Sequence, residues 1–437
     1  MKRMDRILLG AGCFILIVIS WFIALTSKPL AVKQQYLIDK AAKLTADGIY
    51  IRAIPLLEEA AGYNAANTQK AENALKEAYL KLMGNGAFRY EYVSLLEKQM
   101  NRRDASPDVF EEAALYYLDI RRIQDALDVL KDGIAKTGSA DLTRIYEENR
   151  YGYRMSRTSY DDVTTPFEST IQVCEQGLWG IAESDGILMI PCEYEQISTF
   201  SGDRAIAAKN GEIIAVDRDN FRIEKLKLKA SAFGNYANDR LPLCIGGVYV
   251  RVTGGFTAGK MEFENICMYS DGYAAAKISG NWGVVGLGAD WLLPAEYDWI
   301  IQDELGRCYA QGAVFARKGG DVFLFTGGRQ TAGPYEGARP FSSEGYAAVK
   351  KNGKWGYINT KGDVVIDFQF DDALSFGQHL AAVELDGLWG YAGLSGDIVI
   401  APLFIKAKSF SDGSAAVLTD RGWQFITLLE YVRRTGL

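Results

Sequence analysis

The residue types that most often carry chemistry are sparse in this chain. Its 437 residues include one histidine, His379, so catalytic triads, imidazole relays and multi-histidine metal sites lack their usual group. Six cysteines occur without a CxxC pair, which argues against a zinc site and a dithiol redox motif. They are Cys13, Cys174, Cys192, Cys244, Cys267 and Cys308. We predict that the five after Cys13 are buried free thiols.

Four carboxylates recur directly after an aromatic residue, and they are Glu195, Glu264, Asp298 and Asp371. Glycosidic acid-base catalysis needs two carboxylates about 5 to 10 Å apart, whereas acids at a repeat period are spread over the molecule. We therefore expect these acids to cap turns by accepting backbone hydrogen bonds. The chain is predicted to be non-enzymatic, with no catalytic residue, no cofactor and no metal site.

Composition limits the class of protein. With 48% apolar residues, 24% charged residues and a net charge of −7, the chain is neither disordered nor collagen-like. It also lacks the positive charge of a nucleic-acid-binding protein, so nucleic acid is excluded as a predicted partner. The length allows two or three domains.

The N-terminus predicts a membrane anchor. After a polar tail, residues 1–6, the run 7–25 is apolar and just long enough to span a bilayer as a helix. Basic residues flank the run about equally, so the short tail, typical of a signal anchor, decides the orientation. No second run of this length follows. We predict a single-pass protein of the cell membrane with extracytoplasmic C-terminal domains.

Residues 33–153 predict an all-α segment, because apolar positions recur three and four residues apart. Gly48, Ala53, Leu57 and Ala60 resemble the second-helix pattern of the tetratricopeptide repeat, which implies stacked helix pairs. Weaker copies of the pattern follow at Gly86, Leu95, Ala126, Leu130 and Gly133, with Arg121 in the place of a turn glycine. A generic antiparallel helical bundle is the alternative.

A different period begins after Tyr153 and is marked by tryptophan-glycine pairs. The pairs are Trp179-Gly180, Trp282-Gly283, Trp355-Gly356 and Trp389-Gly390, and Trp423 repeats the tryptophan alone. Filling the gaps at the same step predicts eight units, at intervals of 34, 35, 34, 40, 33, 34 and 34 residues. Within a unit, a tight hairpin turn joins two strands and a second turn leads to a third.

These motifs resemble the bacterial WG-repeat, or KWG-repeat, family over residues 155–427, with 428–437 as a C-terminal tail. The resemblance implies an all-β repeat domain and indicates no activity. The array begins with an orphan third strand at Tyr160 and ends one strand short after Trp423. Strands from both ends would complete one unit and remove the exposed sheet edges. We predict a propeller-like ring of about eight three-stranded units, and a curved β-solenoid is the alternative.

The paired tryptophans and glycines are expected to be structural, the indole packing between units while the glycine allows close backbone approach. Trp291 and Trp299 are additional to the repeat and flank Tyr297, just before the stretch that makes the fourth interval 40 residues long. Departures from a repeat often mark a functional face. Trp291, Trp299 and Tyr297 are therefore the predicted partner-binding residues.

These observations predict a multi-domain, membrane-anchored scaffold or binding protein of the bacterial cell envelope. Helical repeats and a WG-repeat β-domain both offer extended surfaces built from rigid units, so another envelope protein is the expected partner. The alternative is a carboxylate-dependent hydrolase or a lectin-like binder that acts on cell-wall glycan.

Overall fold

A computed structural model describes residues 30–218, 223–226, 229–253 and 257–431. The chain divides after Asn149 into a helical unit and a β unit. The predicted anchor, residues 7–25, lies outside the described residues, and within them no helix is long and apolar enough to cross a membrane. The prediction of a single-pass membrane location is corrected on this finding.

The helical unit confirms the all-α segment. Residues 30–46 are helical, and the helices that follow are α2 (Tyr50–Gly62), α3 (Thr68–Leu82), the short 3-10 helix η1 (Met83–Asn85), α4 (Arg89–Met100), α5 (Pro107–Asp119), α6 (Ile123–Thr137) and α7 (Ala140–Asn149). Small residues allow the helices to approach closely. Ala53 and Ala60 of α2 are fully buried, and a Cβ added to Gly133 of α6 would lie 2.8 Å from the Cβ of Phe110 in α5.

Five turns between these helices contain a residue with a left-handed backbone, and three of them come before the second helix of a pair. Gly48, Gly86 and Arg121 have φ of 76°, 81° and 59°, and each precedes the second helix of a pair. Only glycine adopts this conformation without steric cost. Arg121 therefore occupies a position that glycine would fill with less strain, as its alignment with the other two turns predicts.

Arg121→Gly should raise the free energy of unfolding of the helical unit by about 1 kcal/mol, because it removes a strained left-handed side chain from an exposed turn. Urea unfolding followed by circular dichroism at the helical band measures the change. The neighbouring Arg122 has an ordinary φ, an ion pair of 2.8 Å to Asp125 and a place over the Tyr117 ring. Arg122→Gly should destabilise, and equal effects of the two substitutions would contradict the assignment.

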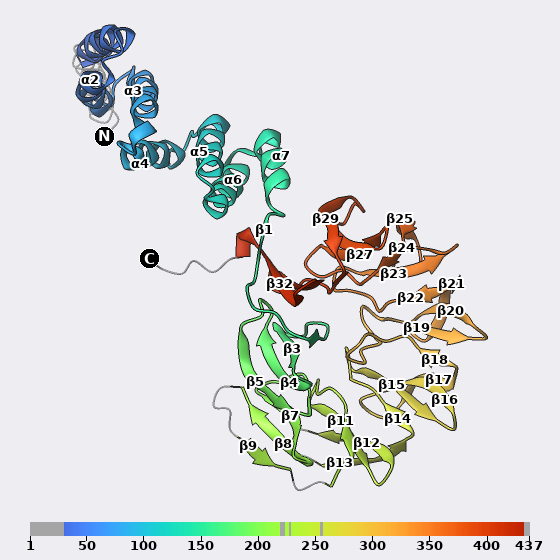
Figure 1. The fold of residues 1–437 in the computed structure, drawn as a ribbon. Coiled ribbons are helices and arrows are strands. Elements are labelled where there is room, and N and C mark those ends of the chain that lie inside the picture. Colours follow the sequence, from blue (N-terminus) through green and yellow to red (C-terminus); the bar gives the residue numbers. More distant parts are fainter. Residues whose placement is uncertain (1–29, 219–222, 227–228, 254–256, 432–437) are drawn as a thin grey trace, which may run out of the picture. The chain divides into compact units, whose positions relative to one another are not determined.

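The β unit is an eight-bladed propeller, in which eight antiparallel sheets are arranged as a ring (Figure 1). The first four sheets are β2 (Asp162–Val163), β3 (Thr170–Glu175), β4 (Leu178–Glu183) and β5 (Leu188–Tyr194); β6 (Gln196–Ile197), β7 (Arg204–Lys209), β8 (Glu212–Asp217) and β9 (Ile223–Lys225); β10 (Ala232–Phe233), β11 (Arg240–Ile245), β12 (Val248–Thr253) and β13 (Ala258–Phe263); β14 (Asn265–Ile266), β15 (Tyr273–Ile278), β16 (Asn281–Gly286) and β17 (Trp291–Tyr297).

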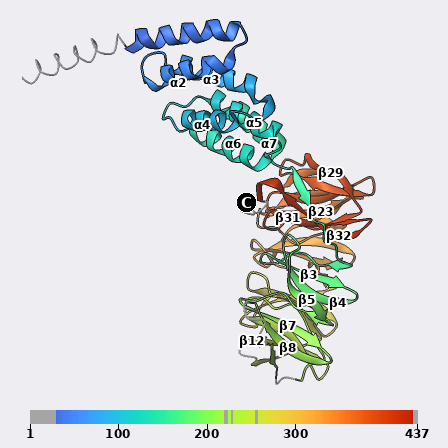
Figure 2. The ribbon, with the colours of Figure 1, turned by 60° about the vertical axis from the view of Figure 1, so that its left-hand side comes forward.

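The remaining sheets follow the same order, and Figure 2 shows the ring from a second direction. They are β18 (Trp299–Ile300), β19 (Ala313–Lys318), β20 (Asp321–Thr326) and β21 (Arg329–Tyr335); β22 (Gly337–Ala338), β23 (Tyr346–Lys351), β24 (Lys354–Asn359) and β25 (Val364–Phe370); β26 (Asp372–Ala373), β27 (Ala381–Leu385), β28 (Leu388–Ala392) and β29 (Ile398–Phe404); β30 (Lys406–Ala407), β31 (Ser414–Thr419), β32 (Gly422–Leu428) and β1 (Tyr153–Met155), with the 3-10 helix η2 (Leu429–Tyr431) at the end.

Each blade has four strands, so the prediction of three-stranded units is wrong. The additional strand has only two residues and directly follows the aromatic-acid pair, as β6 follows Tyr194 and Glu195. Two residues are too few to show the alternation by which a strand is recognised in a sequence.

Strands from both ends of the repeat array close the ring, as predicted, and the open solenoid is excluded. The missing strand of the last blade is β1, which pairs with β32 from Tyr153↔Leu428 to Met155↔Ile426. Tyr160 and Trp423 also exchange two backbone hydrogen bonds of 2.9 Å. The predicted boundaries shift accordingly, because the β unit includes Tyr153 and because Leu428, assigned to the tail, ends β32.

The glycine of each tryptophan-glycine pair lies beneath a bulge. In the seventh blade Trp389 pairs with Phe404 and Tyr391 pairs with Ile400. Between these two pairs the chain advances by two residues in β28 and by four residues in β29, which is a β-bulge. A Cβ on Gly390 would lie 2.5 Å from the carbonyl oxygen of Ile400. Gly180, Gly283 and Gly356 make the same close approach to backbone. None of the four has a positive φ, so the close approach itself requires glycine.

Candidate functional site

A cavity of about 610 Å³ lies where the inner segments of the ring converge. Seven of the eight sheets contribute to its lining, each through the segment between its first and second strands. Because these segments come from sheets around the whole ring, the cavity lies near the ring axis. It is within the size range of ligand-binding sites.

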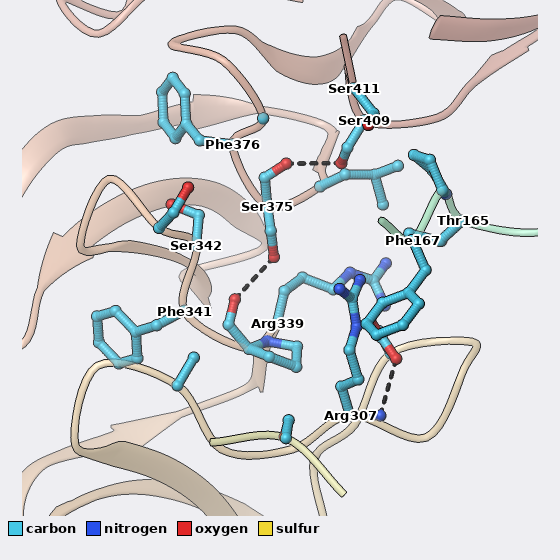
Figure 3. Close-up of a pocket in the computed structure, with 18 of the residues that line it drawn as sticks. Thr165, Phe167, Arg307, Arg339, Phe341, Ser342, Ser375, Phe376, Ser409 and Ser411 are labelled. Atoms are coloured by element: carbon cyan, nitrogen blue, oxygen red, sulfur yellow. Dashed lines mark hydrogen bonds and ion pairs between the residues drawn. The ribbon is translucent and has the colours of Figure 1, made fainter. Parts of the chain in front are cut away.

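One wall of the cavity is made of aromatic and hydroxyl side chains in alternation (Figure 3). The Ser409 hydroxyl donates to the carbonyl oxygen of Ser375, and the Ser375 hydroxyl donates to that of Pro340, both at 2.7 Å. These bonds link the sixth, seventh and eighth blades around the cavity. Phe376 and Phe410 lie beside them and are buried against the blade cores.

The longest interval of the repeat forms a compact loop after β18, residues 301–312. One Oδ1 of Asp303 accepts the backbone N–H groups of Leu305 and Arg307 at 3.0 and 2.9 Å. Its Oδ2 accepts the Arg307 Nε–H at 2.6 Å. A carboxylate that caps its own turn and holds an arginine gives this loop a defined shape.

The loop reaches across the ring. Glu304 of the fifth blade forms an ion pair with Lys408 of the eighth blade, with oxygen-nitrogen distances of 2.5 and 2.6 Å. Glu304 also accepts a hydrogen bond of 3.1 Å from the hydroxyl of Thr165 in the first blade. Asn235 of the third blade donates to the Leu305 carbonyl at 3.1 Å. Leu305, 3% exposed, packs with Ala237 and Met268. The extra residues thus tie distant blades together.

A second cavity, of about 530 Å³, shares Thr165, Asp303 and Arg339 with the first. Because Asp303 belongs to the loop after β18, the loop lies between the two cavities. The second cavity is also lined by Trp299 and Tyr249.

The structure does not bring the three predicted partner-binding residues to one surface. Trp299 is 38% exposed, lines the second cavity and packs edge-on against Trp282 at 4.6 Å between ring centroids. Trp291 is half-buried against Phe263. Tyr297 is 7% exposed and belongs to a blade core, so it is removed from the set of surface candidates.

The tryptophans of the repeat lie between neighbouring blades. Trp355 packs with Ala373 and Phe376 of the next blade, and Trp423 packs with Val173 of the first blade. Trp282 is also buried, whereas Trp179 and Trp389 are half-buried.

The acids after the aromatics cap turns, as predicted. Glu195, Glu264, Asp298 and Asp371 accept the backbone N–H groups of Asn210, Gly280, Gly319 and Asp386, each in the hairpin of the next blade. The Lys354 ammonium and the Asp386 backbone N–H lower the pKa of the Asp371 carboxyl. His379 lies in an exposed turn with φ of 65°. Its backbone N–H donates to the Glu344 carboxylate at 3.0 Å.

Sequence reasoning missed the cavity residues Arg307, Arg339, Ser375 and Ser409. A signal for the serines was available, because an aromatic residue next to serine recurs just before the turn of several units, as in Ser409-Phe410-Ser411. No periodic signal marks the two arginines.

Sequence comparison finds WG repeats in four segments of the propeller. Residues 179–212, 335–355, 355–389 and 389–423 match the family described as WG containing repeat, which confirms the predicted repeats. No curated protein matches the chain.

Structure comparison finds solved structures of low similarity. They include a eukaryotic initiation factor (10% identity, TM-score 0.38, 65% of this chain and 89% of that chain), KlHsv2 with loop 6CD replaced by a Gly-Ser linker (9%, 0.36, 63% and 98%) and the β-propeller domain of Cps50 (Swd1) from Myceliophteria thermophila (9%, 0.32, 53% and 95%). Likeness at this level carries no argument about function.

Proposed function

We propose that this chain is a non-catalytic binding protein whose propeller holds a peptide segment of a partner protein in the cavity on the ring axis. The observation that carries the proposal is the composition of that cavity. Its lining combines aromatic rings, serine hydroxyls and two arginines, drawn from the inner segments of seven blades. Such a surface matches the mixed apolar and polar character of a polypeptide better than that of a purely apolar or purely charged ligand.

The carboxylates near the cavity support a non-catalytic role. Asp303 caps its own loop and pairs with Arg307, and Glu304 pairs with Lys408 and accepts Thr165. A catalytic carboxylate must exchange a proton with the substrate or attack it. The oxygens of Asp303 and Glu304 are instead occupied by hydrogen bonds and ion pairs within the protein.

The helical unit offers a second surface, and we assign it as tetratricopeptide-like. A left-handed residue lies before the second helix of each pair, at Gly48, Gly86 and Arg121, and the turns at Asn64 and Gly138 contain one as well. Small residues lie where the helices approach, as at Ala53 and Gly133. This spacing is typical of stacked helix pairs, which bind peptides and proteins on extended surfaces. Together the two units make the chain a scaffold with two binding surfaces.

Selection of random dodecapeptides on the immobilised full-length chain tests the propeller surface. Ser343 lines the cavity with an exposed side chain, so Ser343→Trp should cover the mouth without entering a core. Selected peptides should bind this variant at least about tenfold more weakly, a loss of about 1.4 kcal/mol. Fluorescence anisotropy with labelled peptides measures the affinity.

Ser395→Trp is the matched control, because Ser395 is an exposed turn serine of the seventh blade that does not line the cavity. It should bind the peptides as the unsubstituted chain does. Recovery of no peptide, or equal binding to the Ser343→Trp variant, would reject the cavity as the binding site. The same chain is applied to a glycan array in parallel. Binding to a glycan together with recovery of no peptide would favour the lectin-like alternative.

A further inference from the structure

Two arginines from different blades line the cavity on the ring axis. Arg307 belongs to the loop after β18, and Arg339 directly follows β22. Figure 3 shows both side chains reaching into the cavity, together with Phe167. The Arg307 guanidinium lies over the Phe167 ring at 5.5 Å, and that of Arg339 lies over the Trp355 ring at 4.9 Å. These rings help to hold the guanidinium groups in place.

The internal partners of the two arginines use only part of their hydrogen-bonding capacity. A guanidinium carries five N–H donors. Arg307 gives its Nε–H to Asp303. Arg339 gives its Nε–H to the Ala373 carbonyl at 3.5 Å, and its Nη2 donates to the two carboxylate oxygens of Asp372 at 3.3 and 3.5 Å. Within the described chain, no hydrogen bond from either terminal NH₂ group of Arg307 or from Nη1 of Arg339 is found. Three NH₂ groups are therefore available to a ligand.

Acidic side chains also line the cavity, and one of them, Asp303, is half-buried beside Arg307. Glu168, Asp271 and Asp412 are exposed turn residues, whereas Arg307 and Arg339 are half-buried. These carboxylates disfavour a free anion, so a carboxylate on a ligand that also carries a positive charge suits the lining better. A peptide that carries a carboxylate and a neighbouring basic residue matches both the arginines and the acids of the lining.

We propose that Arg307 and Arg339 bind a carboxylate of the partner peptide in the cavity, with the acidic side chains of the lining favouring a basic residue beside it. Arginine suits this role because its planar fork can donate two parallel hydrogen bonds to one carboxylate. The carboxylate comes from the peptide C-terminus or from an aspartate or glutamate side chain. This inference rests on the proposed function and specifies the ligand chemistry of the same cavity.

Matched synthetic peptides test the inference. Each selected sequence is made in three forms: acid-free with a C-terminal carboxylate, acid-free with a C-terminal carboxamide, and with a carboxamide and one internal glutamate. On the full chain, the first or third form should bind at least about tenfold more tightly than the second. Tight binding of the first form alone identifies a C-terminal carboxylate, and rescue by the third form identifies a side chain.

Arg307→Gln and Arg339→Gln should each abolish most of the difference between the carboxylate and carboxamide forms. Lys354→Gln is the control, because it removes an exposed positive charge that pairs with Asp371 outside the cavity. It should leave the difference unchanged. Unfolding curves confirm that each variant is folded, and the comparison on the unsubstituted chain needs no variant at all.

Two outcomes would overturn the inference in distinguishable ways. If the acid-free carboxamide binds as tightly as the other forms and Ser343→Trp still blocks it, the carboxylate site is wrong while the peptide-binding function stands. If no form binds, both proposals are wrong.

Discussion

Gly390→Ala should lower the free energy of unfolding of the β unit by about 3 kcal/mol. Its added Cβ would lie 2.5 Å from the Ile400 carbonyl oxygen and 2.7 Å from the Pro402 nitrogen. Both are backbone atoms of β29, so the bulge itself would have to move, and overpacking of this kind is costly. Urea unfolding followed by tryptophan fluorescence measures the effect, because every tryptophan except Trp21 is in the β unit.

Gly393→Ala in the same blade is the matched control. Gly393 also lacks a positive φ, and a Cβ there would lie 3.6 Å from the Val399 Cγ1, which is an ordinary contact. We expect a change of at most about 0.5 kcal/mol. If the two substitutions had the same effect, the close approach beneath the bulge would not be what requires glycine in the tryptophan-glycine pair.

Glu304→Gln should destabilise the β unit by about 1 to 2 kcal/mol, because it leaves the Lys408 ammonium without its carboxylate. The Lys408 side chain is only 10% exposed, whereas that of Glu304 is 53% exposed, which keeps the effect below that of a fully buried pair. Lys408→Met should also destabilise. The double variant should cost less than the sum of the two by about 1 kcal/mol, which would measure the link between the fifth and eighth blades.

Glu296→Gln is the control for this cycle. Glu296 and Lys318 form a pair of 3.3 Å in which both side chains are about half exposed, and such pairs contribute little. Its cost should stay within about 0.5 kcal/mol. Additive effects of Glu304→Gln and Lys408→Met would show that the loop does not couple the two blades energetically.

The repeat could be predicted from the sequence because most blades contain the same short sequence motifs. Tight hairpin turns, the tryptophan-glycine pair and the acid that caps the next hairpin recur at one period, and each acts within or between adjacent blades. Ring closure was also predictable, since the two ends of the array carry complementary fragments. The fourth strand was not, because two residues show no alternation.

The candidate cavity was not predictable from the same signals. Arg307 and Arg339 are 32 positions apart in the chain and follow no period, yet both line it. The loop of residues 301–312 stood out in the sequence as a departure from the repeat. Its irregular length predicts a partner-binding surface. The structure shows in addition that its residues bond to Thr165, Asn235 and Lys408 in three other blades, while Arg307 of the same loop lines the cavity.

The sequence by itself determined the repeat period, the all-α and all-β segments and the closing of the ring. These features depend on neighbouring residues or on contacts between successive repeats, so they leave a periodic trace in the chain. Only the tertiary structure decided which residues meet at the ring axis. Closing the ring brings together there seven segments that are far apart in the sequence. Contacts at such large sequence separation impose no local pattern on the residues that make them.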